Sequence, residues 1–322
     1  MSEGLTGRRI LVTGGSGFIG RHVVSDLAGA GAGVRVVDLV PHPDPAVDVV
    51  LGDIAEPEVL ARATEGGLDA IVHLAAVTSV LKSMEHPEHT FRTNVDGTNA
   101  VLAAGRAAGA TALVFASTNA VTGPMEAPAI TESARLKPLT PYGATKAAGE
   151  MLMSAYTASF GLRCAIMRLT NVYGPGMQAK DSIVARLMRA IRLGRTFEIY
   201  GDGRQVRDYV HAADVTAAVR LGLRSEDWDG PVVIGSGRSL SVLEVVDAVR
   251  SVTGTGDGLQ VTHGPARPGE MPAVIVDPSR ARSLGWSPQF SLEQGLAGVW
   301  EEWSAIELDA VAAGVGTVGA AP

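Results

Sequence analysis

Short apolar runs alternate with longer amphipathic stretches through the first half of the chain. The runs, rich in β-branched residues, predict strands at residues 9–12, 34–38, 48–51, 70–74, 112–117 and 163–168, and the longer stretches predict helices at 18–30, 56–64, 87–108 and 142–160. Because the strands lack a clean apolar–polar alternation and are separated by helices, they indicate a parallel sheet covered on both faces. The predicted fold class is α/β, a doubly wound parallel sheet, in which ligands bind beyond the carboxyl ends of the strands.

The pattern changes after the Gly-Pro-Gly sequence at 174–176. Residues 1–174 are predicted to form the doubly wound domain, and an apolar run at 231–234 predicts one more strand in a segment near 206–236 that returns to the first sheet. Residues 175–205 and 237–308 hold shorter elements punctuated by glycine and proline, which indicates a smaller second domain over the strand ends. The tail at 309–322, rich in Ala, Gly and Val, is expected to be flexible.

Composition narrows the class of protein. The 322 residues suffice for a substantial core, and the net charge of −7 argues against nucleic acid or an anionic membrane as a partner. No stretch approaches the roughly 20 apolar residues of a membrane span. The single Cys164 excludes an internal disulfide and fits a reducing cytoplasm, where we expect the protein to reside. The histidines show no metal-ligand clustering, so no metal is expected.

A glycine-rich turn joins the first predicted strand to the first predicted helix. Gly14, Gly17 and Gly20 follow the spacing G-x-x-G-x-x-G. This pattern lets backbone N–H groups approach a pyrophosphate without obstruction by a Cβ atom, while the positive end of the helix faces the phosphates. The alternative is a tight turn with no ligand, but the flanking strand and helix favour a dinucleotide site.

Asp38 ends the next predicted strand, eighteen residues after Gly20. A carboxylate at this place accepts hydrogen bonds from the ribose hydroxyls of adenosine and repels a 2′-phosphate. A helix or turn cap is the structural alternative. Because no arginine immediately follows Asp38, the sequence favours NAD over NADP as the cofactor.

Tyr142 and Lys146 stand four residues apart in a predicted helix, so their side chains lie side by side. A free phenol has a pKa near 10 and is a poor base at neutral pH. A neighbouring ammonium, together with the positive nicotinamide ring of NAD⁺, favours the phenolate and brings its pKa into the working range. The pair follows Ser117 and Thr118 in the chain and predicts a hydride-transfer enzyme.

Further motifs stand in the order typical of one family. They are TGGSGFIG at 13–20, GDI at 52–54, HLAA at 73–76, Asn94, FAST at 115–118, PYGATK at 141–146, RLTNVYGP at 168–175, RDYVH at 207–211 and RPGE at 267–270. From about residue 8 to 305 the chain resembles the extended short-chain dehydrogenase/reductase family, in its nucleotide-sugar epimerase/dehydratase branch. Its motifs are most similar to those of UDP-hexose and UDP-uronate 4-epimerases.

The resemblance implies a role for each matching position. Tyr142, Lys146 and Thr118 are the implied catalytic residues, with Thr118 bonding the sugar's 4-hydroxyl beside Tyr142. Asp53 and Ile54 would flank adenine. The implied cofactor-binding set is Gly14, Gly17, Phe18, Ile19, Gly20, Asp38, Asp53, Ile54, Leu74, Ala75, Ala76, Asn94, Tyr142 and Lys146. The implied substrate-binding set is Thr118, Tyr142, Asn171, Arg207 and Arg267, of which the last three would hold the nucleotide diphosphate. Guanidinium groups also pair well with phosphate oxygens on physical grounds.

One departure from the family bears on the reaction. Relatives that eliminate water carry Thr-Asp-Glu where this chain has Thr118, Asn119 and Ala120. Elimination needs an acid and a base beyond the tyrosine, and neither an amide nor a methyl group supplies them. The sequence therefore favours 4-epimerisation. Dehydration or reduction of a keto-sugar on the same scaffold stays open, as does a non-catalytic, NAD-responsive regulator.

The sequence indicates the identity of the sugar less clearly than it indicates the reaction. A UDP-linked hexose is the first choice, as glucose and galactose, or as glucuronate and galacturonate if a basic residue reaches C6. Lys180 could do so, as could Arg186, Arg189 and Arg192, although a row of charges at this spacing is more typical of a solvated face. The resemblance also implies a homodimer that pairs through the helices near 94–108 and 142–160.

Overall fold

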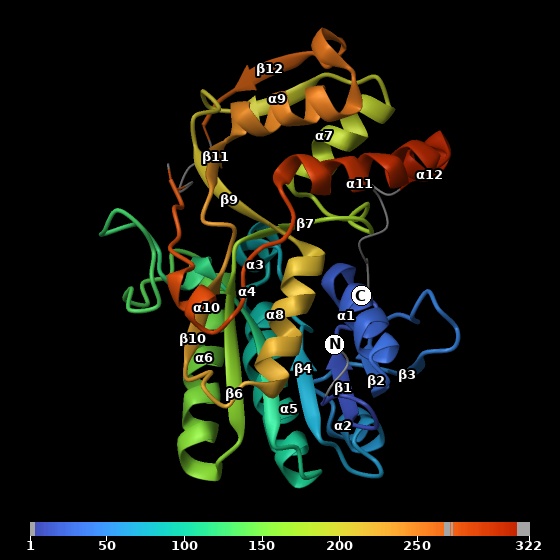
Figure 1. The fold of residues 1–322 in the computed structure, drawn as a ribbon, viewed down its shortest axis with the longest axis vertical. Coiled ribbons are helices and arrows are strands. Elements are labelled where there is room, and N and C mark those ends of the chain that lie inside the picture. Colours follow the sequence, from blue (N-terminus) through green and yellow to red (C-terminus); the bar gives the residue numbers. More distant parts are fainter. Residues whose placement is uncertain (1–3, 267–270, 272, 314–322) are drawn as a thin grey trace.

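The computed structural model describes residues 4–266, 271 and 273–313, and its larger part is a seven-stranded sheet (Figure 1). The strands run in the order β10-β6-β5-β4-β1-β2-β3, and every neighbouring pair is parallel. They are β1 (Arg9–Thr13), β2 (Gly33–Asp38), β3 (Asp48–Leu51), β4 (Ala70–His73), β5 (Ala112–Thr118), β6 (Arg163–Leu169) and β10 (Pro231–Ile234). The predicted doubly wound α/β fold is confirmed.

Helices cover both faces of this sheet. One face carries α1 (Phe18–Gly29) and α8 (Ala212–Arg224), and the other carries α2 (Pro57–Ala63), α5 (Gly97–Ala107) and α6 (Pro141–Phe160). Along β1, Ile10 and Val12 pack on the first face and Leu11 packs on the second. Apolar residues therefore occupy consecutive positions of a strand, because both of its faces are buried.

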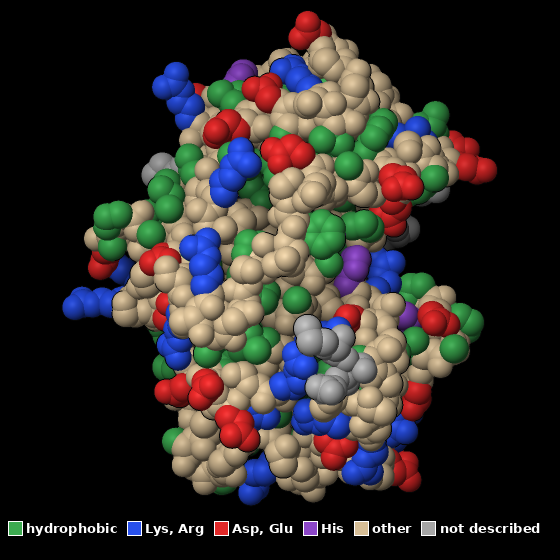
Figure 2. Space-filling view, viewed as in Figure 1, with side chains coloured by type: hydrophobic (Ala, Val, Ile, Leu, Met, Phe, Trp, Pro, Cys, Tyr) green, Lys and Arg blue, Asp and Glu red, His purple; other side chains and the backbone are tan. Residues whose placement is uncertain are grey.

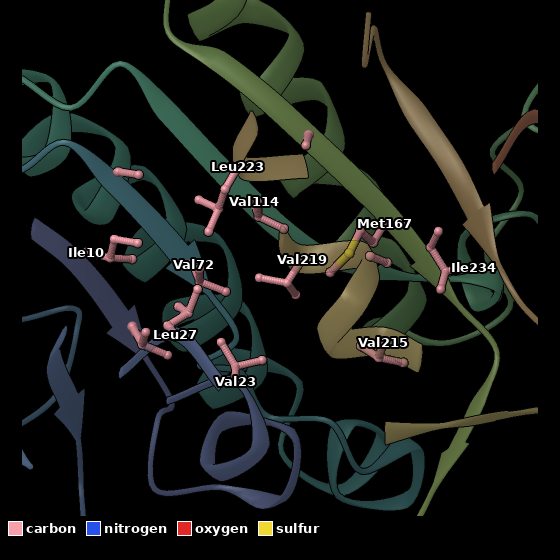
Figure 3. Close-up of a cluster of buried hydrophobic side chains, with 14 of the residues drawn as sticks. Ile10, Val23, Leu27, Val72, Val114, Met167, Val215, Val219, Leu223 and Ile234 are labelled. Atoms are coloured by element: carbon pink, nitrogen blue, oxygen red, sulfur yellow. The ribbon is translucent and has the colours of Figure 1, made fainter. Parts of the chain in front are cut away.

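The core under α1 and α8 is formed by aliphatic side chains. Figure 3 shows Leu27 and Val219 from the two helices lying over Val72 and Val114 of the sheet. These four side chains are fully buried. Burial of each contributes about 1.5–3 kcal/mol relative to exposure, so this layer stabilises the packing of α1 and α8 on the sheet.

A smaller domain lies at the carboxyl ends of the strands (Figure 1). It contains a three-stranded sheet, in which β9 pairs parallel with β7 and antiparallel with β11, and a two-stranded parallel pair of β8 and β12. The strands are β7 (Asn171–Tyr173), β8 (Phe197–Tyr200), β9 (Val206–His211), β11 (Ser239–Ser241) and β12 (Val261–Gly264). Its helices are α7 (Ile183–Arg192), α9 (Val242–Thr253), α11 (Leu292–Ala305) and α12 (Leu308–Ala313). Together they enclose a second hydrophobic core.

Two segments differ from the predicted elements. The single helix predicted at 87–108 is divided into α4 (Pro87–Phe91), a π-helical turn η1 (Arg92–Asp96) and α5. A side-chain periodicity near 3.6 does not reveal one inserted residue of a π-turn, a feature frequent at functional sites. The sequence predicts a flexible tail at 309–322, whereas α12 extends to Ala313 and buries Val311 in the second core. The rest of that predicted tail, residues 314–322, lies outside the described residues.

The remaining short elements connect these parts. They are α3 (Val80–Glu85), the 3₁₀ turns η2 (Asn119–Val121) and η3 (Gly256–Gly258), and α10 (Ser279–Ser283). None of the helices in the described part of the chain could cross a membrane on grounds of length and apolarity. Figure 2 shows acidic and basic side chains interspersed over both domains on the face in view.

Candidate active site

The glycine-rich turn lies at the carboxyl end of β1 and leads into α1. Gly14 has a φ of +73°, a conformation that favours glycine, and a Cβ atom there would stand 2.7 Å from the backbone nitrogen of Ala75. A Cβ atom on Gly20 would overlap the carbonyl oxygen of Gly14. The loop therefore has the tight backbone cradle that the sequence predicts, and it contacts the predicted cofactor residue Ala75.

The start of α1 can receive an anion. Gly17 is its N-cap residue, and no side chain caps the helix. The first N–H groups, at Phe18 and Ile19, stand at the positive end of the helix dipole, which suits a phosphate. Asp38 lies beside the loop, where its Oδ2 atom accepts a hydrogen bond from the N–H of Ser16 at 2.9 Å. A carboxylate oxygen accepts more than one hydrogen bond, so ribose hydroxyls can also bind there. These residues fit a dinucleotide.

The residues predicted to flank adenine follow β3, at the same carboxyl end of the sheet as the glycine-rich turn. Asp53 accepts a hydrogen bond from the N–H of Ala55 at 2.9 Å. Ile54 is 4% exposed and packs so closely on α5 that a Cβ atom on Gly97 would meet its side chain at 2.8 Å. Leu74, Ala75 and Ala76 follow β4 directly. The structure thus brings the predicted cofactor residues to one edge of the sheet.

Asn94 lies in the π-turn and is 1% exposed. Its Oδ1 atom accepts from the N–H of Val77 at 2.8 Å, and its Nδ2 atom donates to the oxygen of Val77 and to Oγ1 of Thr145, both at 3.0 Å. The side chain therefore ties the segment after β4 to α6. The resemblance implies that it lines the cofactor, whereas its amide is committed to contacts within the protein.

His73 is a structural residue. Its ring nitrogens contact the hydroxyls of Thr13 at 2.6 Å and Thr98 at 2.9 Å. Burial, with a smaller contribution from Lys146, lowers the pKa of His73 to about 3, so the ring is neutral at physiological pH. Within the ranges that the structure describes, no three His, Cys, Asp or Glu side chains form a group able to hold a metal ion.

The predicted catalytic side chains meet where β5 ends and α6 begins. Thr140 caps α6 by accepting a hydrogen bond from the N–H of Gly143 at 3.2 Å, and Pro141 opens the helix. Thr118 lies close enough to Tyr142 for its hydroxyl to act on the phenol and lower its pKa. Lys146 is 3% exposed, and its Nζ atom donates to the carbonyl oxygen of Ala116 at 2.8 Å.

The charge states of this pair differ from the expectation. Burial raises the pKa of Tyr142 to about 12, although the Thr118 hydrogen bond acts in the opposite direction. Burial also lowers the pKa of Lys146 to about 7. Removal from water disfavours the charged form of each group, and this outweighs the predicted effect of the ammonium on the phenol. In the protein without NAD⁺, burial therefore dominates, and the joint effect of Lys146 and the nicotinamide ring on the pKa of Tyr142 stays a prediction.

The two positions that distinguish dehydratases hold no acid. Asn119 is 5% exposed, and within the described chain both polar atoms of its amide are buried without a partner. Ala120 donates its N–H to Oγ1 of Thr118 at 3.2 Å. A carboxylate does lie nearby on α6, that of Glu150, but Arg168 and Ser117 both bind it. The sequence analysis did not single out Glu150, although its place four residues after Lys146 puts it on the same helix face.

Two of the three residues predicted to hold the diphosphate lie on the small sheet of the second domain. Asn171 of β7 donates from Nδ2 to the backbone oxygen of Asp208 at 2.9 Å, and Arg207 of β9 donates from Nη1 to the oxygen of Val206 at 2.8 Å. Strands β7 and β9 are neighbours, so the small sheet brings the two together. The third, Arg267, lies outside the described residues.

The arginines of α7 pack against the second domain. Arg186 stacks over the rings of Phe197 and Tyr200, Arg189 donates to the oxygen of Gln178 at 2.7 Å, and Arg192 donates to the oxygen of Ile306. All three are partly buried. The three arginines therefore do not form the solvated face typical of such spacing; they connect α7 to neighbouring parts of the second domain.

Comparison with known proteins agrees with this site. A model of the NAD dependent epimerase/dehydratase family matches residues 10–235. The chain is 32% identical to a UDP-glucose 4-epimerase from Thermus thermophilus, solved as a complex with NAD, with a TM-score of 0.87 over 93% of this chain and 100% of that one. It is 34% identical to MoeE5, solved with UDP-glucuronic acid and NAD, with a TM-score of 0.81 over 92% and 98% of the two chains.

A dehydratase is equally similar in sequence. The dTDP-glucose 4,6-dehydratase of Streptomyces griseus is 33% identical over 305 residues, which are 89% of this chain and 92% of that one. The family match, the dinucleotide cradle and the tyrosine–lysine helix agree. The chain belongs to the NAD-dependent epimerase/dehydratase family of the extended short-chain dehydrogenases/reductases, and its cofactor is NAD.

Proposed function

We propose that the protein is a 4-epimerase of a UDP-linked hexose, with UDP-glucose and UDP-galactose as the first choice. One observation carries this proposal: Thr118 lies beside Tyr142 at the carboxyl end of the sheet, and the two residues after Thr118 offer an amide and a methyl group. Removing and restoring the hydrogen of C4 needs only one proton acceptor, the tyrosine. Eliminating water needs further acid–base groups, which Asn119 and Ala120 do not provide.

The reaction begins at the 4-hydroxyl of the sugar. Tyr142, as the phenolate, takes the hydroxyl proton while the C4–O bond becomes a carbonyl, and Thr118 orients the oxygen. NAD⁺, which the glycine-rich turn and Asp38 would hold, would supply the redox chemistry as the acceptor and donor of the C4 hydride. Tyr142 then gives the proton back to the C4 oxygen. Protons, electrons and atoms balance, so the product has the mass of the substrate.

The ketone must turn over between the two half-reactions while its nucleotide stays bound. Asn171 and Arg207 stand on adjacent strands of the small sheet, and Arg267 follows in the chain. We assign these three side chains to the diphosphate, where guanidinium groups pair with phosphate oxygens. Anchoring the diphosphate leaves the sugar ring to rotate about its own linkage.

A uronate is the second candidate for the sugar. The likeness to MoeE5, whose structure holds UDP-glucuronic acid, favours it. Lys180 lies just before α7. Burial lowers the pKa of its ammonium, because the charged form is partly removed from water. A carboxylate at C6 of the sugar is a suitable partner for this group. The three arginines of α7 are engaged within their own domain.

The first prediction concerns the product. Incubation with UDP-glucose is expected to give UDP-galactose of identical mass, with no external reductant consumed, as measured by NMR of the sugar ring protons and by mass spectrometry. UDP-glucuronate and UDP-N-acetylglucosamine are tested in parallel. A product lighter by one water identifies a dehydratase, and consumption of added reductant identifies a keto-sugar reductase. NAD binding without turnover of any of these sugars identifies a regulator.

The second prediction concerns the base. Tyr142→Phe removes the proton acceptor and is expected to lower kcat by at least about a hundredfold while NAD binding is retained. Tyr156→Phe is the matched control on the same helix, because the hydroxyl of Tyr156 donates to Oδ1 of Asn99 at 3.4 Å, at an exposed place away from Thr118. Substantial turnover by the Tyr142→Phe protein, measured with the preferred sugar, contradicts the assignment.

The assembly is also part of the proposal. We propose a homodimer that pairs through α5 and α6, as the family resemblance implies. Met151 and Phe160 of α6 and Phe91 of α4 are large apolar side chains that are each more than half exposed in the single chain. Such side chains gather where a surface is covered by a partner.

The third prediction tests the dimer. Light scattering after size-exclusion chromatography is expected to give twice the chain mass of 33.2 kDa for the wild type. Met151→Glu is expected to give a single-chain mass because a charge cannot be buried unpaired in the interface. A wild-type mass of one chain, or an unchanged dimer in the variant, contradicts pairing through α6.

A further inference from the structure

A buried ion pair lies one turn beyond Lys146 on α6, outside the catalytic set described above. The carboxylate of Glu150 accepts hydrogen bonds from Nε of Arg168 at 3.0 Å, from Nη2 at 2.8 Å and from Oγ of Ser117 at 2.5 Å. The side chains of Glu150 and Arg168 are only 6% and 4% exposed, so solvent does not weaken the pair. A guanidinium held at two points fixes orientation as well as distance.

The cluster belongs to a ladder between β5 and α6. Three consecutive residues at the end of β5 each contact a residue on one face of the helix, at spacings of four. The pairs are Ala116 with Lys146, Ser117 with Glu150, and Thr118 with Tyr142. Ser117 is next to Thr118 on the strand, whereas Glu150 follows Tyr142 by eight residues (150 − 142) on the helix, so both contacts hold the same length of α6 against the end of β5.

Arg168 extends the cluster to two further parts of the fold. Its Nη1 atom donates to the backbone oxygen of Glu132 at 3.0 Å, in the segment that leads to α6. The carboxylate of Glu132 in turn accepts the N–H of Val233 in β10 at 2.8 Å. Helix α6 is therefore tied through polar contacts to β5, β6 and the edge strand of the sheet.

Stability alone does not account for such a pair. Well-packed apolar side chains of similar volume hold a buried site as well as an ion pair or better, because the charges lose their hydration. Apolar packing does not fix the orientation of a side chain as directional hydrogen bonds do. We propose that the Ser117–Glu150–Arg168 cluster is a positioning device that holds the phenol of Tyr142 against the hydroxyl of Thr118. This inference rests on the proposed 4-epimerase function.

The position of Tyr142 against Thr118 affects the pH dependence of kcat. The Thr118 hydrogen bond lowers the pKa of Tyr142. If the helix shifts and this bond weakens, the pKa rises, and the phenolate needed for the first proton transfer forms only at higher pH. The rising limb of the kcat–pH profile then moves to higher pH. A residue with a purely structural role leaves this limb in place.

The test is the double variant Glu150→Leu/Arg168→Met, which replaces the ion pair with apolar side chains and leaves no unpaired charge. The melting temperature is expected to stay near the wild-type value. We expect kcat to fall about tenfold to a hundredfold, as small misplacements of a catalytic group do, with KM little changed and the rising pH limb shifted upward. A double variant with wild-type kcat and pH profile overturns the proposal.

Two further variants complete the test. Asp26→Leu/Arg220→Met is the matched control, since that pair joins α1 and α8 at 3.2 Å away from the β5–α6 ladder, and it is expected to leave the pH profile unchanged. Ser117→Ala removes only the hydrogen bond from β5 to Glu150 and leaves the ion pair in place. If the double variant does not fold, the proposal requires that Ser117→Ala shifts the pH limb in the same direction, and an unchanged limb overturns it.

Failure of the proposed function remains distinguishable. A wild-type protein that turns over no nucleotide sugar defeats the 4-epimerase proposal itself. The ionisation of Tyr142 can still be followed in the NAD-bound protein by the ultraviolet absorbance of tyrosinate, with Tyr142→Phe as the blank. The double variant is expected to titrate at higher pH than the wild type, and an equal titration overturns the positioning role.

Discussion

The close contact between the end of β5 and the first turns of α6 is the constraint on which the site depends. Two glycines of the helix permit it: a Cβ atom on Gly143 would stand 2.6 Å from the oxygen of Ala120, and one on Gly149 would stand 2.5 Å from the ring of Phe115. With the helix seated this deeply, Tyr142 reaches Thr118, and Lys146 reaches the backbone of the strand. The sheet fixes the position of Thr118 at the end of β5, and the cap at Thr140 fixes the first turn of α6, which carries Tyr142.

The same closeness sets the electrostatics. Phenol and ammonium are both removed from water, so burial shifts the pKa of Tyr142 up and that of Lys146 down, and each favours its neutral form. Tyr142 therefore keeps its proton at neutral pH, and little phenolate is present until another positive charge stabilises it. In the proposed mechanism NAD⁺ would bring that charge, which would couple proton transfer at Tyr142 to the presence of the hydride acceptor.

Much of the fold follows from local patterns. Apolar runs predict the seven strands, and the spacing of Gly14, Gly17 and Gly20 predicts the dinucleotide turn, because both signals are contiguous in the chain. The π-turn around Asn94 and the Glu150–Arg168 pair depend on segments that meet only after folding. The balance between burial and charge at Tyr142 likewise depends on its three-dimensional surroundings, because burial is a property of the folded chain.

The central claim is that burial keeps Tyr142 protonated and that the positive cofactor releases its proton. The direct measurement is the ultraviolet titration of tyrosinate, as the difference between the wild type and Tyr142→Phe, with and without NAD⁺. The account predicts a pKa of about 12 in the protein freed of cofactor and a clearly lower value once NAD⁺ is bound. The same pKa in both states, or a tyrosinate already formed at neutral pH without NAD⁺, would contradict it.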